Sequence, residues 1–128
     1  MDLEFGPEYD DFRKEVKTFI KENEAVNLVG KSLRSKERVD WQQKLIDQGY
    51  FARSIPKEYG GFGGDTDILK TRIIAEEFAK SPIPKAMGGQ GIQMLVPTLL
   101  SLGTEEQKQQ YIRPTLRGEM IWCQGYSE

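Results

Sequence analysis

The most informative residues of the chain are glycines, which occupy four of the five positions from Gly60 to Gly64. Backbone without side chains can approach a phosphate closely, and nucleotide-binding loops use this property. A phosphate loop also ends in Gly-Lys-Ser/Thr, and a dinucleotide fingerprint follows a strand with spaced glycines, and neither pattern is present. Tyr59 and Phe62 add apolar mass that flexible linkers lack. The stretch therefore predicts an ordered turn that packs these two rings.

Side chains that commonly carry catalysis are scarce. The chain has no histidine, so no Ser-His-Asp or Cys-His machinery can be built within it. A zinc site would depend on carboxylates and one thiol, which is an unusual donor set. We therefore predict no metal site and no hydrolase. The single cysteine, Cys123, is predicted to be an inert buried thiol.

Apolar residues at helical spacing predict an all-α fold, a bundle of about five helices. The first helix opens at Gly6-Pro7, the second spans 35–48, the third begins near Asp65 and ends at Ser81-Pro82, and the fourth spans 85–102. Pro97 lies inside the fourth pattern and is expected to kink it. Thr104 and Gln107 form a capping-box pattern that opens a fifth helix, predicted to end before Pro114.

Composition limits the classes of partner. The 128 residues fit one domain, and the net charge of −2 excludes a surface built to follow a nucleic-acid backbone. No apolar run reaches membrane-spanning length. The acidic start lacks a signal-peptide profile and there is one cysteine, so we expect a cytoplasmic protein, or a mitochondrial matrix protein in a eukaryote.

The last segment has a different character. Residues 120–126 are apolar and aromatic on both faces, which predicts a short buried strand. A single strand cannot satisfy its own backbone hydrogen bonds, and nothing else in the chain predicts a sheet. We therefore expect the strand to pair with residues beyond Glu128 or with another chain, and this polypeptide to be the front part of a longer protein.

The order of several motifs resembles the N-terminal helical domain of acyl-CoA dehydrogenases. The motifs are Leu45-x-x-x-Gly49-Tyr50, Ile55-Pro56-x-Glu58-Tyr59-Gly60-Gly61-x-Gly63, Glu76-Glu77, Gly103-Thr104-Glu105-Glu106-Gln107-Lys108, Gly118-Glu119 and Trp122-Cys123-Gln124-Gly125-Tyr126-Ser127-Glu128. The resemblance implies a helical domain over 1–118 and, over 119–128, the truncated start of a middle β domain. In this family of FAD flavoproteins, a glutamate removes the α proton of an acyl-CoA thioester while the β hydrogen leaves as hydride.

The resemblance also implies site residues. Ser127 matches a hydroxyl that bonds the flavin's pyrimidine side, and Gln124 and Tyr126 match positions lining its ring. Gly88 and Gly89 would wall the acyl pocket, although their segment is equally typical of a loop or frayed helix start. The catalytic glutamate is expected in a C-terminal part that is absent here. Glu76 and Glu77 are instead predicted to be a helical surface or domain-contact pair.

Three functions remain open at this point. The first is an acyl-CoA dehydrogenase fragment, whose complete form would pass electrons to an acceptor such as an electron-transfer flavoprotein and form a homo-oligomer. The second is an acyl-CoA oxidase-like relative, in which reduced flavin meets oxygen. The third is a non-catalytic helical interaction module. In the first two cases we expect the isolated fragment to be inactive, because it lacks the base and most of the flavin site.

Overall fold

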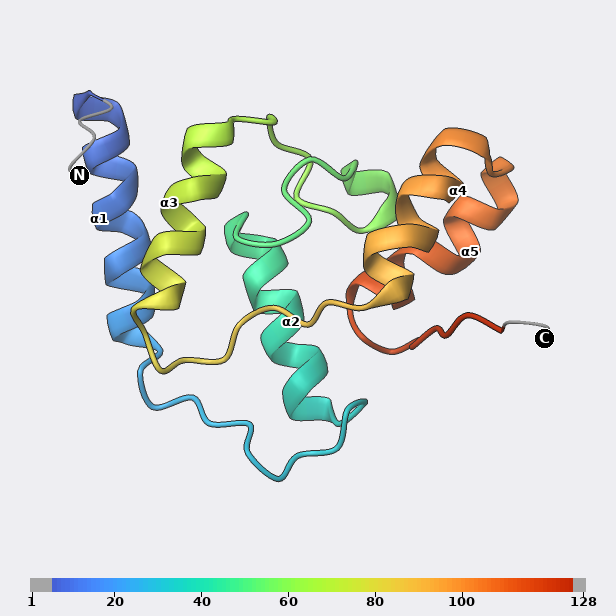
Figure 1. Cartoon of the computed structure of the whole chain (residues 1–128), viewed down its shortest axis with the longest axis horizontal. Helices are drawn as coiled ribbons and strands as arrows, with labels where there is room; N and C mark the ends of the chain where they lie inside the picture. Colours follow the sequence, from blue (N-terminus) through green and yellow to red (C-terminus); the bar gives the residue numbers. More distant parts are fainter. Residues whose placement is uncertain (1–5, 126–128) are drawn as a thin grey trace. The chain divides into compact units, whose positions relative to one another are not determined.

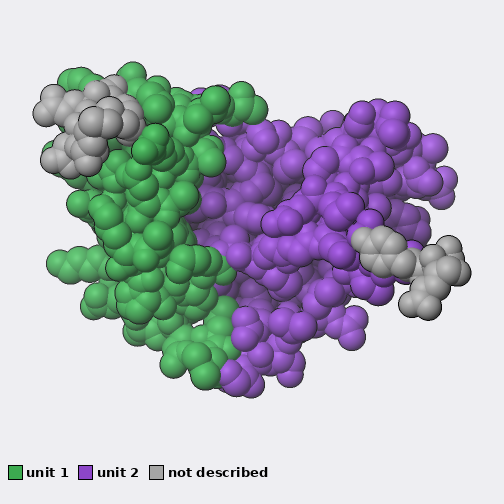
Figure 2. Space-filling model, in the orientation of Figure 1, with its two compact units in different colours: residues 1–29, 66–85 green, residues 30–65, 86–128 purple. Residues whose placement is uncertain are grey.

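A computed structural model describes residues 6–125, and over this range the chain contains helices and no strand. It has five α-helices, a short 3₁₀ helix and a π-helical turn (Figure 1). The chain divides into two compact units, one made of residues 1–29 and 66–85, the other of residues 30–65 and 86–128 (Figure 2). The predicted all-α class is confirmed.

The first unit is a pair of helices that lie side by side, α1 (Pro7–Glu22) and α3 (Ile68–Ala79) (Figure 1). Pro7 occupies the first turn of α1, as predicted. The N–H groups of a helix's first turn have no partner within the helix, so proline loses no hydrogen bond at this position. Helix α3 begins three residues later than predicted because Asp67 is the cap, accepting bonds from the next N–H groups. The Phe19 and Phe78 rings stack with centroids 6.4 Å apart.

An ion-pair cluster also joins the two helices of this unit. Arg13 donates to Glu77 at 2.6 Å and to Glu76 at 3.0 Å. The Glu77 side chain is only 5% exposed, so the prediction of a surface or domain-contact pair is wrong for this residue: it is a buried counter-ion. Hydrogen bonds from Arg13 and Arg72 lower the pKa of Glu76. Although partial burial opposes its charge, the hydrogen bonds to Glu76 and Glu77 raise the pKa of Arg13.

The second unit is built around α2 (Lys36–Gln48) and the helices that follow the glycine-rich stretch. Ser35 caps α2 by accepting a bond from the Arg38 N–H, and Gly49 ends it with a left-handed φ of 80°. Both ends lie where the sequence predicts them. A hydrophobic core cluster of the unit combines one buried residue of α2 with buried residues of the segments that follow it: Ile46, Tyr59, Val96, Leu99, Ile112 and Leu116.

The glycine-rich stretch forms the ordered turn that the sequence predicts. It begins with a 3₁₀ helix, η1 (Lys57–Tyr59), and continues through Gly60 and Gly63, whose positive φ values of 100° and 71° suit glycine. Tyr59 is buried, and its hydroxyl donates to the Glu105 carboxylate at 2.8 Å. This bond is the main cause that raises the Tyr59 pKa to about 12. The Phe62 ring packs beneath the Arg53 guanidinium.

The fourth helix is shorter than predicted. Residues 84–88 have no regular structure, and the helical part comprises a π-helical turn, η2 (Gly91–Leu95), followed by α4 (Val96–Leu102). Gly88 and Gly89 disfavour a helix, and Gly89 has a φ of 127°, which no helix contains. Pro97 lies in the first turn of α4, directly after the π-helical turn, and the expected kink stays a prediction.

The fifth helix, α5 (Glu105–Leu116), is longer than predicted. Its capping box forms as expected, with the Thr104 side chain accepting from the Gln107 N–H and the Gln107 side chain accepting from the Thr104 N–H. The predicted end before Pro114 is wrong, because the helix continues through this residue. Thr115 and Leu116 become almost fully buried in the continuation, and this burial offsets the one backbone bond that proline removes.

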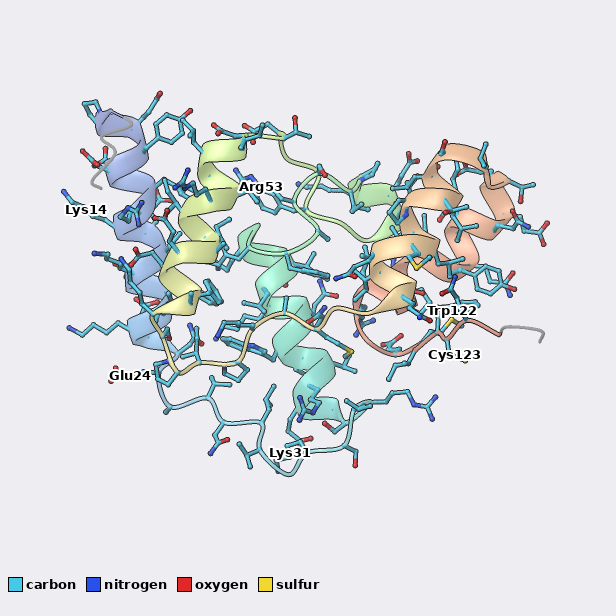
Figure 3. The ribbon with its side chains drawn as sticks, viewed as in Figure 1. Lys14, Glu24, Lys31, Arg53, Trp122 and Cys123 are labelled. Atoms are coloured by element: carbon cyan, nitrogen blue, oxygen red, sulfur yellow. The ribbon has the colours of Figure 1, made fainter. Side chains whose placement is uncertain are left out.

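Residues 121–125 follow α5 without regular structure. A strand requires a hydrogen-bonded neighbour, and the described residues provide none for this segment, so the predicted strand stays a prediction. Cys123 is exposed, and the prediction of a buried thiol is therefore wrong (Figure 3). The thiol faces outward because the neighbouring Trp122 is the side chain that packs inward.

Candidate functional site

A hollow in the second unit is a candidate ligand-binding surface. Its volume is about 30 Å³, room for one or two water molecules. Its lining comes from the start of the fourth helical segment, α5 and the chain after α5: Met87, Gly88, Gly89, Gln90, Gly91, Ile92, Thr115, Met120, Ile121 and Trp122. None of these side chains is titratable. The hollow is too small to hold an acyl chain or a flavin alone.

Gly88 and Gly89 lie in this lining, where a side chain would project into free space. A Cβ on Gly89 would meet nothing within 4 Å, and one on Gly88 would meet only the Gln93 Nε2 atom, at 3.4 Å. The two positions differ in backbone conformation, because only Gly89 has a φ that L-residues rarely adopt. The structure thus brings both predicted pocket residues to one concave surface.

Trp122 forms the opposite wall and is fixed from three directions. Its Nε1–H donates to the Thr115 hydroxyl at 2.8 Å, and that hydroxyl donates to the Tyr111 carbonyl oxygen at 2.6 Å. Its ring meets the Tyr111 ring edge to face, with centroids 5.6 Å apart. Gly91 permits the close approach, since a Cβ there would lie 2.5 Å from the indole. Trp122 is therefore a structural residue.

Replacing Thr115 with valine should release the indole. The variant keeps the shape of the side chain and removes the hydroxyl that accepts the Trp122 bond, so we expect a loss of about 1–2 kcal/mol in the free energy of unfolding. We also expect a shift in the fluorescence of Trp122, read in a background where Trp41 is replaced by phenylalanine. Thr98→Val, which removes an exposed hydroxyl that donates to the Met94 carbonyl oxygen one turn earlier, is the control. Equal behaviour of the two variants would contradict the assignment.

Gln124 lies at the rim of the hollow, where Gln90 holds it. The backbone N–H of Gln124 donates to Gln90 Oε1 at 2.7 Å, and the two side-chain amides approach to 3.5 Å. The other two predicted flavin-site residues, Tyr126 and Ser127, lie outside the described residues. The structure thus places one of the three, on an exposed segment tied to the pocket wall.

Two glutamines that organise this site could not both be recognised from sequence. Gln90 bonds to a backbone group 34 residues away, which leaves no local signal. Gln42 did leave one: it lies one turn before Leu45 and Ile46, so its polar side chain falls on the apolar face of α2. A buried polar residue in an apolar stripe predicts a specific hydrogen-bonding task.

The described part of the chain contains neither a candidate metal site nor a helix that could span a membrane. Between residues 6 and 125, no group of three or more Cys, Asp or Glu side chains is arranged to hold a metal ion. Over the same residues, no helix combines the length and apolar character needed to cross a membrane.

The geometry is that of a helical domain with a small hollow whose lining includes no titratable side chain. A profile of the family described as "Acyl-CoA dehydrogenase, N-terminal domain" matches residues 6–119. The chain belongs to the acyl-CoA dehydrogenase family, of which it carries the N-terminal domain, as the order of motifs predicted.

Individual relatives agree with the family match. Acyl-CoA dehydrogenase IpdE1 of Mycolicibacterium smegmatis is 32% identical over 94% of this chain and 33% of its own length. The short-chain specific acyl-CoA dehydrogenase of Clostridium acetobutylicum is 33% identical over 100% of this chain and 34% of its own. A 3-(aryl)acrylate reductase of Clostridium sporogenes is 39% identical over 60% of this chain and 20% of its own. The chain spans about a third of the length of the first two.

A solved structure shows the same fold. In the crystal structure of the ChsE4–ChsE5 complex from Mycobacterium tuberculosis, one chain superposes on this one with a TM-score of 0.61 and 25% identity. The match covers 100% of this chain and 32% of that chain. The arrangement of helices described above is therefore the arrangement of the family's N-terminal helical domain.

Proposed function

We propose that this chain acts as the N-terminal domain of an FAD-dependent acyl-CoA dehydrogenase that oxidises an acyl-CoA thioester between its α and β carbons. The observation that carries the proposal is the family match over residues 6–119, together with the apolar hollow that the two predicted pocket glycines line. The domain's own task is to form one wall of the acyl pocket and one side of the flavin surroundings.

The segment after α5 fits the edge of a flavin site. Gln124 and Gly125 are exposed, and a Cβ on Gly125 would meet nothing within 4 Å, so a planar ring can lie against this backbone. We propose that Gln124, Tyr126 and Ser127 contact FAD, with Ser127 donating or accepting at the pyrimidine side. When bound, FAD supplies the hydride acceptor for the β hydrogen.

The proton-removing base is proposed to lie outside this chain. No acidic residue lines the hollow. Two carboxylates elsewhere in the domain already have structural partners: Glu105 accepts from Tyr59, and Glu77 pairs with Arg13. A general base must come within hydrogen-bond reach of the proton that it removes. We accordingly propose that the domain alone neither retains flavin nor turns over substrate.

Two alternative chemistries follow from the same scaffold. An oxidase-like relative would pass electrons from reduced flavin to oxygen, and oxygen consumption compared with acceptor reduction separates it from a dehydrogenase. A reductase would run the reaction toward saturation, and this alternative is favoured by two relatives named for reduction, the 3-(aryl)acrylate reductase and a caffeyl-CoA reductase–Etf complex subunit of Acetobacterium woodii. A non-catalytic interaction module would show none of these activities.

Partners of the complete protein are also proposed from its relatives. The Acetobacterium woodii relative is named as a subunit of an Etf complex, and the structural neighbour was solved as a complex of two proteins. We propose an electron-transfer flavoprotein as electron acceptor and assembly into an oligomer. The net charge of −2 gives no reason to expect a nucleic-acid partner.

A leucine at Gly88 tests the role of the hollow. Gly89 is unsuitable for this substitution, because its φ of 127° would strain any other residue. The φ of Gly88 lies outside this left-handed region, so Gly88→Leu adds a side chain beside the hollow without straining the backbone. In the full-length enzyme we expect the preferred acyl chain to shorten, with kcat/KM for the longest good substrate falling about tenfold or more.

The control for this experiment is Gly88→Ala, which adds one methyl group in ordinary contact with Gln93. It should leave the chain-length profile close to that of the wild type. If Gly88→Leu is active and its profile is unchanged, the hollow is not part of the acyl pocket.

A further inference from the structure

A buried glutamine on α2, Gln42, connects the two segments that line the hollow. Gln42 is only 2% exposed, although glutamine is mostly found at protein surfaces. An uncharged amide that is buried without partners costs free energy, so its hydrogen bonds show what it does.

The Gln42 side chain makes three hydrogen bonds with described residues, and all three join it to backbone groups of Met87 and Leu116. Its Oε1 accepts from the Met87 N–H at 2.9 Å, and its Nε2 donates to the Met87 carbonyl oxygen at 3.3 Å. The same Nε2 donates to the Leu116 carbonyl oxygen at 3.0 Å. The Gln42 amide thus satisfies the backbone N–H and carbonyl groups of Met87 and the carbonyl group of Leu116, the last residue of α5.

The two residues that Gln42 holds stand at the bases of the two walls. Met87 directly precedes Gly88 and Gly89 in a stretch without regular structure, which has no helical bonds of its own to fix it. Leu116 ends α5, from which the chain continues to Trp122. The Met87 methyl group also lies against Gly118, where a Cβ would approach it to 2.6 Å.

We propose that Gln42 is a positioning residue that sets the spacing of these two walls and thereby the size of acyl group that the enzyme accepts. This inference rests on the proposed function. Only a side chain that both donates and accepts can hold the Met87 peptide group and the Leu116 carbonyl at once. Glutamate loses the donors and leucine loses every bond, although both are close to glutamine in size.

The test compares Gln42→Leu with Gln43→Leu in the full-length protein. Gln43 is the adjacent residue on the same helix, and its amide bonds only to the Asp47 side chain one turn away, so the two variants make the same chemical change. A third variant, Leu99→Ala, weakens the core cluster to which Leu116 also belongs, but it leaves the hydrogen bonds of Gln42 to Met87 and Leu116 their partners, and so it shows what general destabilisation does.

Two measured quantities are expected to change in Gln42→Leu but not in Gln43→Leu. Hydrogen exchange followed by mass spectrometry should show faster exchange in the peptide that contains Met87. The ratio of kcat/KM between a long and a short acyl-CoA should change about fivefold or more, while kcat with the best substrate stays within about twofold. Gln42→Glu should give an intermediate exchange rate, since its carboxylate still accepts from the Met87 N–H.

The outcomes separate the two claims. If the wild-type protein turns over acyl-CoA and the Gln42→Leu ratio stays unchanged, or shifts only as much as in Leu99→Ala, the positioning role is overturned and the proposed function stands. If the wild-type protein turns over no acyl-CoA, the proposed function fails and the selectivity role fails with it, while the exchange data still show whether Gln42 holds the Met87 peptide.

Discussion

Replacing Gly61 with alanine is expected to lower the free energy of unfolding by about 3 kcal/mol, the upper part of the range for forced overpacking. A Cβ at this position would overlap the carbonyl oxygen and the Cβ of Ile55, which belong to the same turn. The turn has little freedom to move aside, because Gly61 donates to the Pro56 carbonyl and Gly63 donates to that of Ile55. Thermal unfolding followed by circular dichroism measures the loss.

Gly125→Ala is the matched control for this prediction. Its Cβ would meet nothing within 4 Å, and its φ lies outside the left-handed region. A midpoint of unfolding close to that of the wild type is expected. A Gly61→Ala protein as stable as Gly125→Ala would show that the glycine-rich stretch is not the closely packed turn described above.

Removing the charge of Arg13 is expected to have the second-largest effect, about 2 kcal/mol. Arg13→Met leaves the Glu77 carboxylate buried without its shortest partner, and truncating one member of a buried ion pair is costly for this reason. The expected loss of stability is smaller than for a buried charge left with no partner, because Lys17 and Lys80 remain at 3.8 and 3.4 Å from the same carboxylate. Urea unfolding monitored by circular dichroism gives the value.

Lys14→Met, at an exposed residue on the same helix, provides the comparison (Figure 3). It makes a similar change of charge and size without touching Glu77, so its stability should stay within about 0.5 kcal/mol of the wild type. The double variant Arg13→Met/Glu77→Gln should recover part of the loss, because the buried charge is then gone. An Arg13→Met protein as stable as Lys14→Met would contradict the account of this cluster.

Local chemistry made much of this fold predictable from sequence. Ser35 and Gly49 bound α2 as expected, and the Thr104–Gln107 capping box opens α5, since each depends on bonds between residues only a few positions apart. The wrong boundaries arise where burial opposes local preference. Pro114 would end an isolated helix, but Leu116 contributes to the core of its unit only if the helix continues.

The candidate site was predictable only in part. The sequence could indicate Gly88 and Gly89 as pocket residues through a family resemblance, and the structure places both beside the hollow. It could not indicate that Gln42 bonds to Met87 and Leu116, which lie 45 and 74 positions away. Cys123 was predicted to be buried because free cysteine usually is, but Trp122 takes the inward position.

Anaerobic mixing of the full-length protein with acyl-CoA tests the central claim most directly. The account predicts a purified protein that carries oxidised FAD and loses the flavin's visible absorbance when a saturated acyl-CoA is added, with formation of the enoyl-CoA product. A full-length protein that binds no flavin, or whose flavin stays oxidised with acyl-CoA substrates of every chain length and branching tested, would contradict it.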